Sequence, residues 1–198
     1  MGLQELCRGE SGHNMKQTSG IERFEALLRS APQGPPSHLE AWNPPYCGDI
    51  GLAIQSDGTW SYRGSPIRRM ALVKLFARVL RREADGRYYL VTPAEKVDVA
   101  VEDAPFLAVE METWGEGADQ RIVFRTNVDD IVACGPEHPL RFVAQAPSGG
   151  LKPYLRVRGS LEALLTRALT LDLVERAIPD SEGRLVVWSN GACFRLEP

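Results

Sequence analysis

Hydrophobic and polar residues alternate along much of the chain, and this alternation predicts a series of short strands. Residues 50–54 carry apolar side chains at every second position, residues 56–58 read Ser-Asp-Gly, and residues 60–62 alternate again. Alternation on both sides of a turn sequence is typical of a β-hairpin. The same pattern, bounded by turn residues, predicts further strands at 87–91, 97–101, 107–111, 122–124, 185–188 and 193–196.

Two segments with helical spacing of apolar residues interrupt the strands. The first runs from Pro66 to about Arg82, with Ser65 as its predicted N-cap, and the second runs over residues 161–174 after Ser160. Both follow the tripeptide Arg-Gly-Ser, and both are followed by a turn and a strand. The repeated order predicts an internal duplication of a unit made of a hairpin, a helix and a second hairpin.

The sequence therefore predicts an α+β protein of two related lobes, each with hairpins around one helix. Residues 1–40 are expected to form a leader, a short helix at Ile21, Phe24, Leu27 and Leu28, and a proline-rich linker. Met1 and Met15 are both candidates for the natural start. The N-terminal lobe is predicted at 41–113 and the C-terminal lobe at 114–198.

Composition and charge narrow the classes of partner. Of the 198 residues, 43% are hydrophobic and 25% are charged, as in folded globular proteins. The net charge of -3 has the wrong sign for a protein that binds nucleic acid through its phosphates. No apolar run approaches the roughly 18 residues of a membrane span, and the N-terminus does not resemble a signal peptide. We therefore expect a cytoplasmic protein with no membrane span and no nucleic-acid partner.

The cysteines and histidines predict neither a metal site nor a cofactor. They are scattered, with no Cys-x-x-Cys pair and no histidine at metal-ligand spacing: Cys7, Cys47, Cys134, Cys193, His13, His38 and His138. The cysteines are expected to be reduced thiols, with Cys47, Cys134 and Cys193 buried as small apolar groups.

Several spaced motifs resemble a known family. They are GDI at 48–50, DGTW at 57–60, GSPI at 64–67, YLVTP at 89–93, VEDAPF at 101–106, TNVDD at 126–130, HPL at 138–140 and RVRG at 156–159. Over about residues 40–198 the chain resembles the uncharacterised proteobacterial domain-of-unknown-function family 1285. The resemblance implies two domains with an internal duplication, a C-terminal half superficially similar to pleckstrin homology-like barrels, and a ligand site at the domain interface. It also implies a role in signalling, but no established activity.

Two pairs of arginines are candidate anion ligands. Arg68 and Arg69 fall in the first turn of the predicted helix, where the helix dipole favours negative charge, so an anionic partner would stabilise them. Arg156 and Arg158 alternate on one strand with Tyr154 in register, an arrangement that can hold a planar anion. The alternative is that these arginines lie in solvent or form ordinary surface ion pairs.

Two further residues are candidates of the N-terminal lobe. Lys96 follows the capping-box turn at 92–95, in which Glu95 has a structural role, and is free to contact a ligand. Trp60 shares a strand face with Tyr62 and either packs in the core or contacts a ligand.

Asn127, Asp129 and Asp130 form a polar bend, and His138 lies nearby in sequence. Such residues either close a bend on its own backbone or contribute to a site. The leading hypothesis is a non-enzymatic binding or regulatory module that recognises a small anionic ligand or a protein segment between the lobes. The alternative is a metal-dependent or acid/base hydrolase or transferase that uses Asp129, Asp130 and His138. A protein-interaction scaffold with exposed strand edges is a third possibility.

Overall fold

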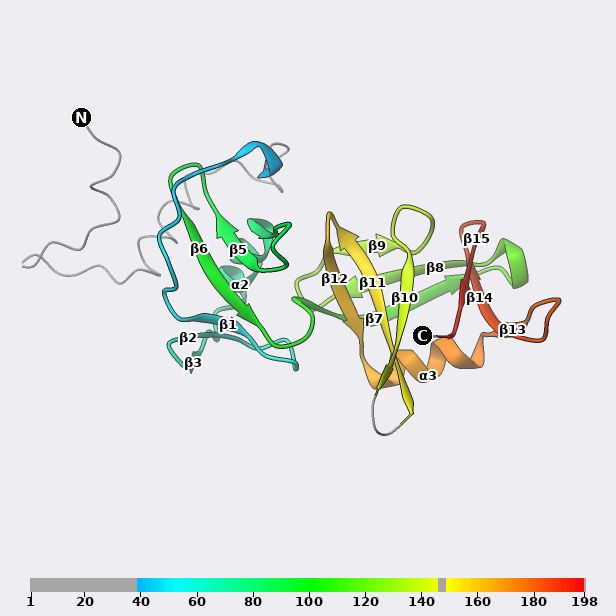
Figure 1. Ribbon diagram of the computed structural model, residues 1–198. Helices are drawn as coiled ribbons and strands as arrows, with labels where there is room; N and C mark the ends of the chain where they lie inside the picture. The colour runs from blue at the N-terminus through cyan, green and yellow to red at the C-terminus, as the bar shows by residue number, and fades with distance from the viewer. Residues whose placement is uncertain (1–38, 146–148, 198) are drawn as a thin grey trace, which may run out of the picture.

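The computed structural model describes residues 39–145 and 149–197, which form two mostly β lobes lying side by side (Figure 1). The predicted leader, its helix and most of the proline-rich linker lie outside the described residues. Within the described part of the chain, each lobe contains a six-stranded sheet and one α-helix. No helix in this part has the length and hydrophobicity that crossing a bilayer requires.

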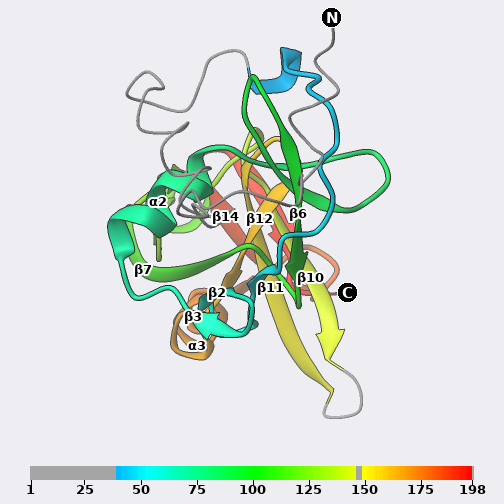
Figure 2. The same cartoon turned by 90° about the vertical axis from the view of Figure 1, so that its left-hand side faces the viewer.

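The N-terminal lobe is one sheet with a helix beside it (Figure 2). Its elements are η2 (Leu39–Ala41), β1 (Leu52–Ile54), β2 (Trp60–Tyr62), β3 (Ser65–Pro66), α2 (Met70–Arg78), β4 (Leu80–Arg82), β5 (Tyr88–Val91) and β6 (Lys96–Val101). The sheet has the order β3-β2-β1-β6-β5-β4. Its strands pair antiparallel except at the centre, where β1 and β6 are parallel.

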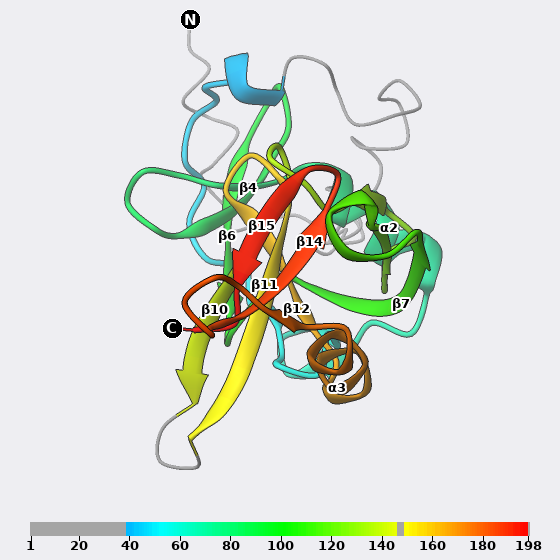
Figure 3. The same cartoon turned by 90° about the vertical axis from the view of Figure 1, so that its right-hand side faces the viewer.

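The C-terminal lobe contains a second six-stranded sheet and a smaller three-stranded one. Its elements are β7 (Phe106–Trp114), η3 (Gly117–Asp119), β8 (Arg121–Thr126), β9 (Ile131–Ala133), β10 (Leu140–Gln145), β11 (Gly150–Arg158), β12 (Leu161–Leu165), α3 (Arg167–Glu175), β13 (Ile178–Pro179), β14 (Leu185–Ser189) and β15 (Ala192–Arg195). The larger sheet has the order β10-β11-β12-β7-β8-β9, with β12 and β7 parallel. Figure 3 shows β14 and β15 in front of this sheet, where β15 contacts β10.

The two six-stranded sheets have the same connectivity. In each lobe two three-stranded antiparallel units meet where the first strand of the lobe pairs in parallel with the sixth. The central strands β6 and β7 are consecutive in the chain and are joined by residues 102–105. The boundary between the lobes therefore lies in this short connection. The predicted boundary at 113/114 is wrong because it would divide β7, which belongs wholly to the second sheet.

The predicted hairpins are confirmed, but both predicted helices start too early. Ser65 and Pro66 pair with β2, so α2 begins only after Arg69, its N-cap residue. Leu80–Arg82 pairs with β5, which ends α2 at Arg78. Strand pairing on both sides thus shortens the helix that the apolar spacing predicts.

The second helix differs more from the prediction. Leu161–Leu165 forms β12, and α3 begins after Thr166, whose hydroxyl caps the amide of Leu169. Leu-Glu-Ala-Leu-Leu favours a helix locally, but its first, third and fifth residues are buried in the sheet, and this burial outweighs local propensity. Ser65 and Ser160 are therefore not N-caps. Each lies at the turn of a hairpin whose second strand precedes a helix.

The buried hydrophobic residues of both lobes form one continuous cluster. Helix α3 covers β7, β11 and β12, with Leu169 and Leu173 facing the sheet. Leu171 projects from the opposite side of the same helix and is 57% exposed. The helix therefore offers two leucines of the same size in contrasting environments.

The pair of leucines on α3 tests this packing. Replacing the fully buried Leu173 with Ala should lower the free energy of unfolding by about 2–5 kcal/mol, since it removes buried surface and leaves a cavity. The matched control Leu171→Ala should change it by no more than about 0.5 kcal/mol. Urea unfolding followed by circular dichroism measures both values. Equal losses in the two variants would contradict the observed orientation of the helix.

Candidate functional site

The strand order brings three separate segments to those strand ends of the second sheet that face the N-terminal lobe. Strand β7 begins there at Phe106, and its parallel partner β12 begins beside it at Leu161. The antiparallel neighbour β8 ends on the same side, with Thr126 opposite Ala108. The turns at 127–130 and 158–160 therefore lie next to the connection between the lobes.

Arg158 is the central side chain of this junction. Its guanidinium pairs with Asp130 at 2.7 Å and donates a hydrogen bond to the carbonyl of Ala77 at the end of α2. It also lies 5.1 Å from the centre of the Phe106 ring. One half-buried cation thus joins β11, the β8–β9 turn and the N-terminal lobe, so Arg158 stabilises the contact between the lobes.

Asp129 makes a second ionic contact across the junction. Lys74 of α2 pairs with one carboxylate oxygen, and Arg125 pairs with the other at 2.7 Å. These two hydrogen bonds hold the pKa of Asp129 below its usual value. Asp129 is therefore charged and fully paired near neutral pH.

Asn127 does not close the bend on its own backbone but ties the bend to β7. The hydroxyl of Thr126 closes the bend by accepting from the amides of Val128 and Asp130. The side-chain oxygen of Asn127 accepts a hydrogen bond from the backbone amide of Leu107 at 3.0 Å, and its backbone amide donates to the Leu107 carbonyl at 2.8 Å. A methyl group at Gly58 would lie 2.8 Å from the side-chain nitrogen of Asn127, so the two lobes are in close contact here. Asn127 consequently has a structural role at the junction.

A further polar cluster joins the connection between the lobes to β11. Asp103 accepts hydrogen bonds from Lys152 at 2.7 Å and from the Tyr154 hydroxyl at 2.6 Å. Burial alone would raise the pKa of Asp103, but these two donors outweigh it and lower the pKa. The pKa of Tyr154 is raised by burial and by its bond to Asp103. Arg141 lies over the Tyr154 ring and pairs with Glu162 through two hydrogen bonds.

The candidate arginines do not form one group. A β-bulge lies between Arg156 and Arg158, so Arg158 reaches the N-terminal lobe whereas Arg156 stays exposed. Arg68 and Arg69 are also exposed, but they precede α2, and their predicted place in its first turn is wrong. The side chains of Arg68 and Arg156 make no ion pair with any residue that the structure describes.

Lys96 and Trp60 lie away from the junction. Lys96 pairs with Glu83 at 2.9 Å and lies 4.7 Å from the centre of the Tyr89 ring, within the N-terminal lobe. Trp60 is 1% exposed and packs on Phe76 in the core. The core alternative considered for Trp60 is therefore the observed one.

His138 contacts the backbone of β11 and forms no ion pair with either aspartate among the residues that the structure describes. One ring nitrogen lies 3.1 Å from the carbonyl oxygen of Arg156, while Asp129 and Asp130 pair with basic side chains. Within 39–145 and 149–197, no three His, Cys, Asp or Glu side chains gather as a metal ion would require.

The cysteines differ in part from the prediction. Cys134 is a buried thiol, and burial raises its pKa to about 12. Cys193 is exposed because the alternation along β15 turns Phe194 inward instead. Cys47 is disulfide-bonded, so the expectation of a reduced thiol there is wrong.

Sequence reasoning missed Lys74 and Arg78 of α2 and Arg141 of β10. Lys74 and Arg78 are four residues apart on one helix and so share a face, a spacing that the sequence does contain. Arg141 gives no comparable signal, because its partner Glu162 is brought to it by the pairing of distant strands.

The role assigned to Arg158 can be tested against its neighbour on the same strand. Arg158→Gln should lower the free energy of unfolding by about 1–3 kcal/mol, because it leaves Asp130 and the Ala77 carbonyl without their donor. The exposed control Arg156→Gln should change it by no more than about 0.5 kcal/mol. Chemical denaturation measures both. An Arg158 variant as stable as the control would show that the junction does not depend on this residue.

The Asp103 cluster predicts a dependence of stability on pH. Because the pKa of Asp103 is lowered in the folded state, its stabilising contribution is present above the unfolded pKa of about 3.9 and is lost as pH falls through the folded pKa. Asp103→Asn should be less stable than the parent chain at pH 6, and the difference should shrink towards pH 3. Urea titrations at both pH values measure it. A difference that stays constant would contradict the prediction.

Comparisons with known proteins identify the family. The model of the DUF1285 N-terminal domain matches residues 35–104, and that of the DUF1285 C-terminal domain matches residues 105–196; both are described as being of unknown function. No curated protein matches this sequence.

Two crystal structures are similar to the chain. A DUF1285 family protein from Silicibacter pomeroyi DSS-3 is 41% identical, with a TM-score of 0.81 over 87% of this chain and 93% of that one. A DUF1285 family protein from Shewanella baltica OS155 is 28% identical, with a TM-score of 0.50 over 64% of this chain and 92% of that one. The two matched domains meet at residues 104/105, within the connection between the two observed lobes, and together they span most of the sequence. The chain therefore belongs to the DUF1285 family.

Proposed function

We propose that this protein is a cytoplasmic, non-enzymatic binding or regulatory module with a role in signalling. Its ligand carries an anionic group, on a small molecule or a protein segment, and binds beside the junction of the two lobes. The observation that carries the proposal is the distribution of paired and unpaired charges around Arg158.

The carboxylates at the core of the junction are already neutralised. Lys74 and Arg125 pair with Asp129, and Arg158 pairs with Asp130. These aspartates are therefore poorly suited to act as a general base or to bind a metal ion. The contacts favour a rigid binding surface over acid/base chemistry.

Two arginines flank this junction without a carboxylate partner among the described residues. Arg78 directly follows Ala77, whose carbonyl binds Arg158, and Arg156 precedes Arg158 by two residues on β11. The carboxylate opposite Arg156 is Glu162, which already pairs with Arg141 through two hydrogen bonds. Positive charge is thus left uncompensated next to a junction in a chain whose net charge is -3. Such a surface attracts anions.

Binding of inorganic phosphate tests the proposal directly. Arg78→Gln and Arg156→Gln should each weaken binding about ten-fold or more, the effect of losing one charge-assisted hydrogen bond. The control is Arg195→Gln, an exposed arginine on β15, which should bind like the parent chain. Calorimetric titration measures the affinities, and mass spectrometry of natively purified protein identifies any anion that co-purifies.

Two outcomes would contradict the proposal. Equal phosphate binding by all three variants would exclude the junction as the anion site. Stoichiometric bound metal that is lost in Asp130→Asn or His138→Ala would instead favour the alternative, a metal-dependent hydrolase or transferase.

We further propose that the two lobes arose by duplication. Identical strand connectivity in the two sheets supports this origin, and on this basis β1–β6 correspond to β7–β12. Helix α2 then has no counterpart inside the second sheet, since α3 follows β12. The predicted correspondence of the two Arg-Gly-Ser segments is wrong, because they occupy the β2–β3 and β11–β12 turns, which are not equivalent in the two sheets. The likeness of the C-terminal lobe to pleckstrin homology-like barrels remains a prediction from the family resemblance.

A further inference from the structure

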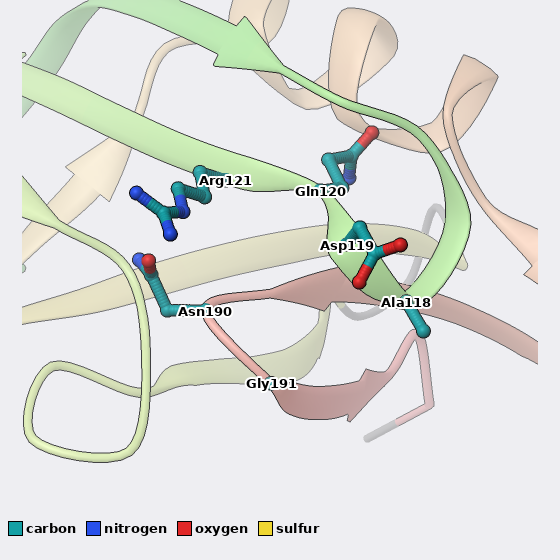
Figure 4. Close-up of a pocket in the computed structure, with 6 residues that line it drawn as sticks. All are labelled: Ala118, Asp119, Gln120, Arg121, Asn190 and Gly191. Atoms are coloured by element: carbon teal, nitrogen blue, oxygen red, sulfur yellow. The ribbon is translucent and has the colours of Figure 1, made fainter.

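A polar pocket lies between η3, the start of β8 and the β14–β15 turn. Figure 1 shows these elements at the end of the C-terminal lobe away from the N-terminal lobe. The volume of the pocket is about 280 Å³, at the small end of the roughly 300–1,000 Å³ of ligand pockets. Figure 4 shows the residues that line it, which come from η3, the start of β8 and the β14–β15 turn: Ala118, Asp119, Gln120, Arg121, Asn190 and Gly191.

Hydrogen bonds between distant strands fix one wall of this pocket. The side-chain amide of the buried Gln120 donates to the Trp188 carbonyl at 2.8 Å. The backbone carbonyl of Gln120 accepts from the backbone amide of Asn190 at 3.0 Å. The side-chain amide of Asn190 donates to the Cys134 carbonyl at 2.6 Å. The β14–β15 turn is therefore held against β8, and the wall is formed before any ligand binds.

The loop that leads into β8 fixes another part of the lining. Gly115 has a φ of 73°, and a methyl group there would lie 2.8 Å from the carbonyl oxygen of Asp119. This close approach holds the backbone of Asp119 in place. Arg121, two residues later, lies opposite Trp114 at the first paired backbone position of the β7–β8 hairpin. Both charged residues of the pocket thus project from well-defined backbone.

Arg121 and Asp119 carry opposite charges but do not neutralise each other. Neither forms an ion pair within 4.0 Å with any residue that the structure describes. By contrast, six other arginines among the described residues pair with carboxylates: Arg81, Arg87, Arg125, Arg141, Arg158 and Arg184. Figure 4 shows Arg121 above Asn190 on one side of the group and Asp119 on the other. The pocket therefore presents one cation and one anion at separate places.

We propose that this pocket binds a small zwitterion of the size of a free amino acid, with its carboxylate on Arg121 and its ammonium group on Asp119. A guanidinium recognises a carboxylate through paired hydrogen bonds, and a carboxylate recognises an ammonium group in the same charge-assisted way. The side-chain NH2 group of Asn190 donates to the Cys134 carbonyl, and its side-chain oxygen is a further hydrogen-bond acceptor in the pocket. The site is distinct from the lobe junction and does not depend on the function proposed for it.

Three probes separate the two charge contacts: L-serine carries both charges, acetate only the negative one and methylammonium only the positive one. We expect L-serine to shift the amide signals of Arg121 and Gly191 in nitrogen–proton correlation spectra, with a dissociation constant at least ten-fold lower than that of either single-charge probe. Arg121→Gln and Asp119→Asn should each weaken L-serine binding at least ten-fold. Arg195→Gln, a change of the same kind outside the pocket, should leave it unchanged.

Two other results would overturn the proposal. Equal affinity for L-serine and acetate, with no effect of Asp119→Asn, would assign a simple anion site. The absence of shifts at about 10 mM L-serine, roughly ten-fold above a 1 mM dissociation constant, would show that the pocket does not bind this class of ligand. Both substituted residues are exposed, and neither replacement is larger than the residue it replaces, so the fold is retained, and the thermal midpoint of each variant serves as the check.

Discussion

The architecture depends on one kind of pairing, the parallel contact between the first and sixth strands of each lobe. Parallel strands cannot be joined by a tight turn, so the intervening chain must cross over between them, and here it does so through antiparallel strands on both sides. In the first lobe this chain includes α2, which the strands on either side limit to Met70–Arg78. The same pairing makes β6 and β7 the central strands of their sheets. Because they are consecutive, the two sheets are held close together by residues 102–105.

The composition of the lobe junction follows from this arrangement. Parallel pairing of β12 with β7 brings the turn after Arg158 to the end of the sheet where β7 begins, and antiparallel pairing of β8 brings Asp130 to the same end. Their ion pair therefore forms where α2 can offer the carbonyl of Ala77. Half-buried charges are tolerated here because each has a partner of opposite sign or a backbone acceptor.

Local sequence patterns predicted the hairpins well, since alternation and turn residues act over a few positions. The hairpin of β1 and β2 has the predicted partners, and β7 and β8 form over the predicted strands at 107–111 and 122–124. Leu161–Leu165 was not predicted as a strand although it forms a hairpin with β11, because its residues favour a helix locally and its other partner, β7, lies more than fifty residues away in the chain. The site residues follow the same rule. The bend at Asn127 was predictable from its residue types, whereas the partner of Arg158 was not.

Arginines in this protein differ less in sequence context than in what the fold places beside them. Arg156 and Arg158 lie on one strand, yet a bulge directs Arg158 to a carboxylate and a carbonyl, while the carboxylate opposite Arg156 is already paired. Arg121 begins a strand and forms no ion pair with the residues that the structure describes, although Asp119 lines the same pocket. A paired guanidinium contributes to the fold, and an unpaired one retains its full capacity to bind an anion. The topology, which sets the partners, therefore decides which arginines remain available for ligands.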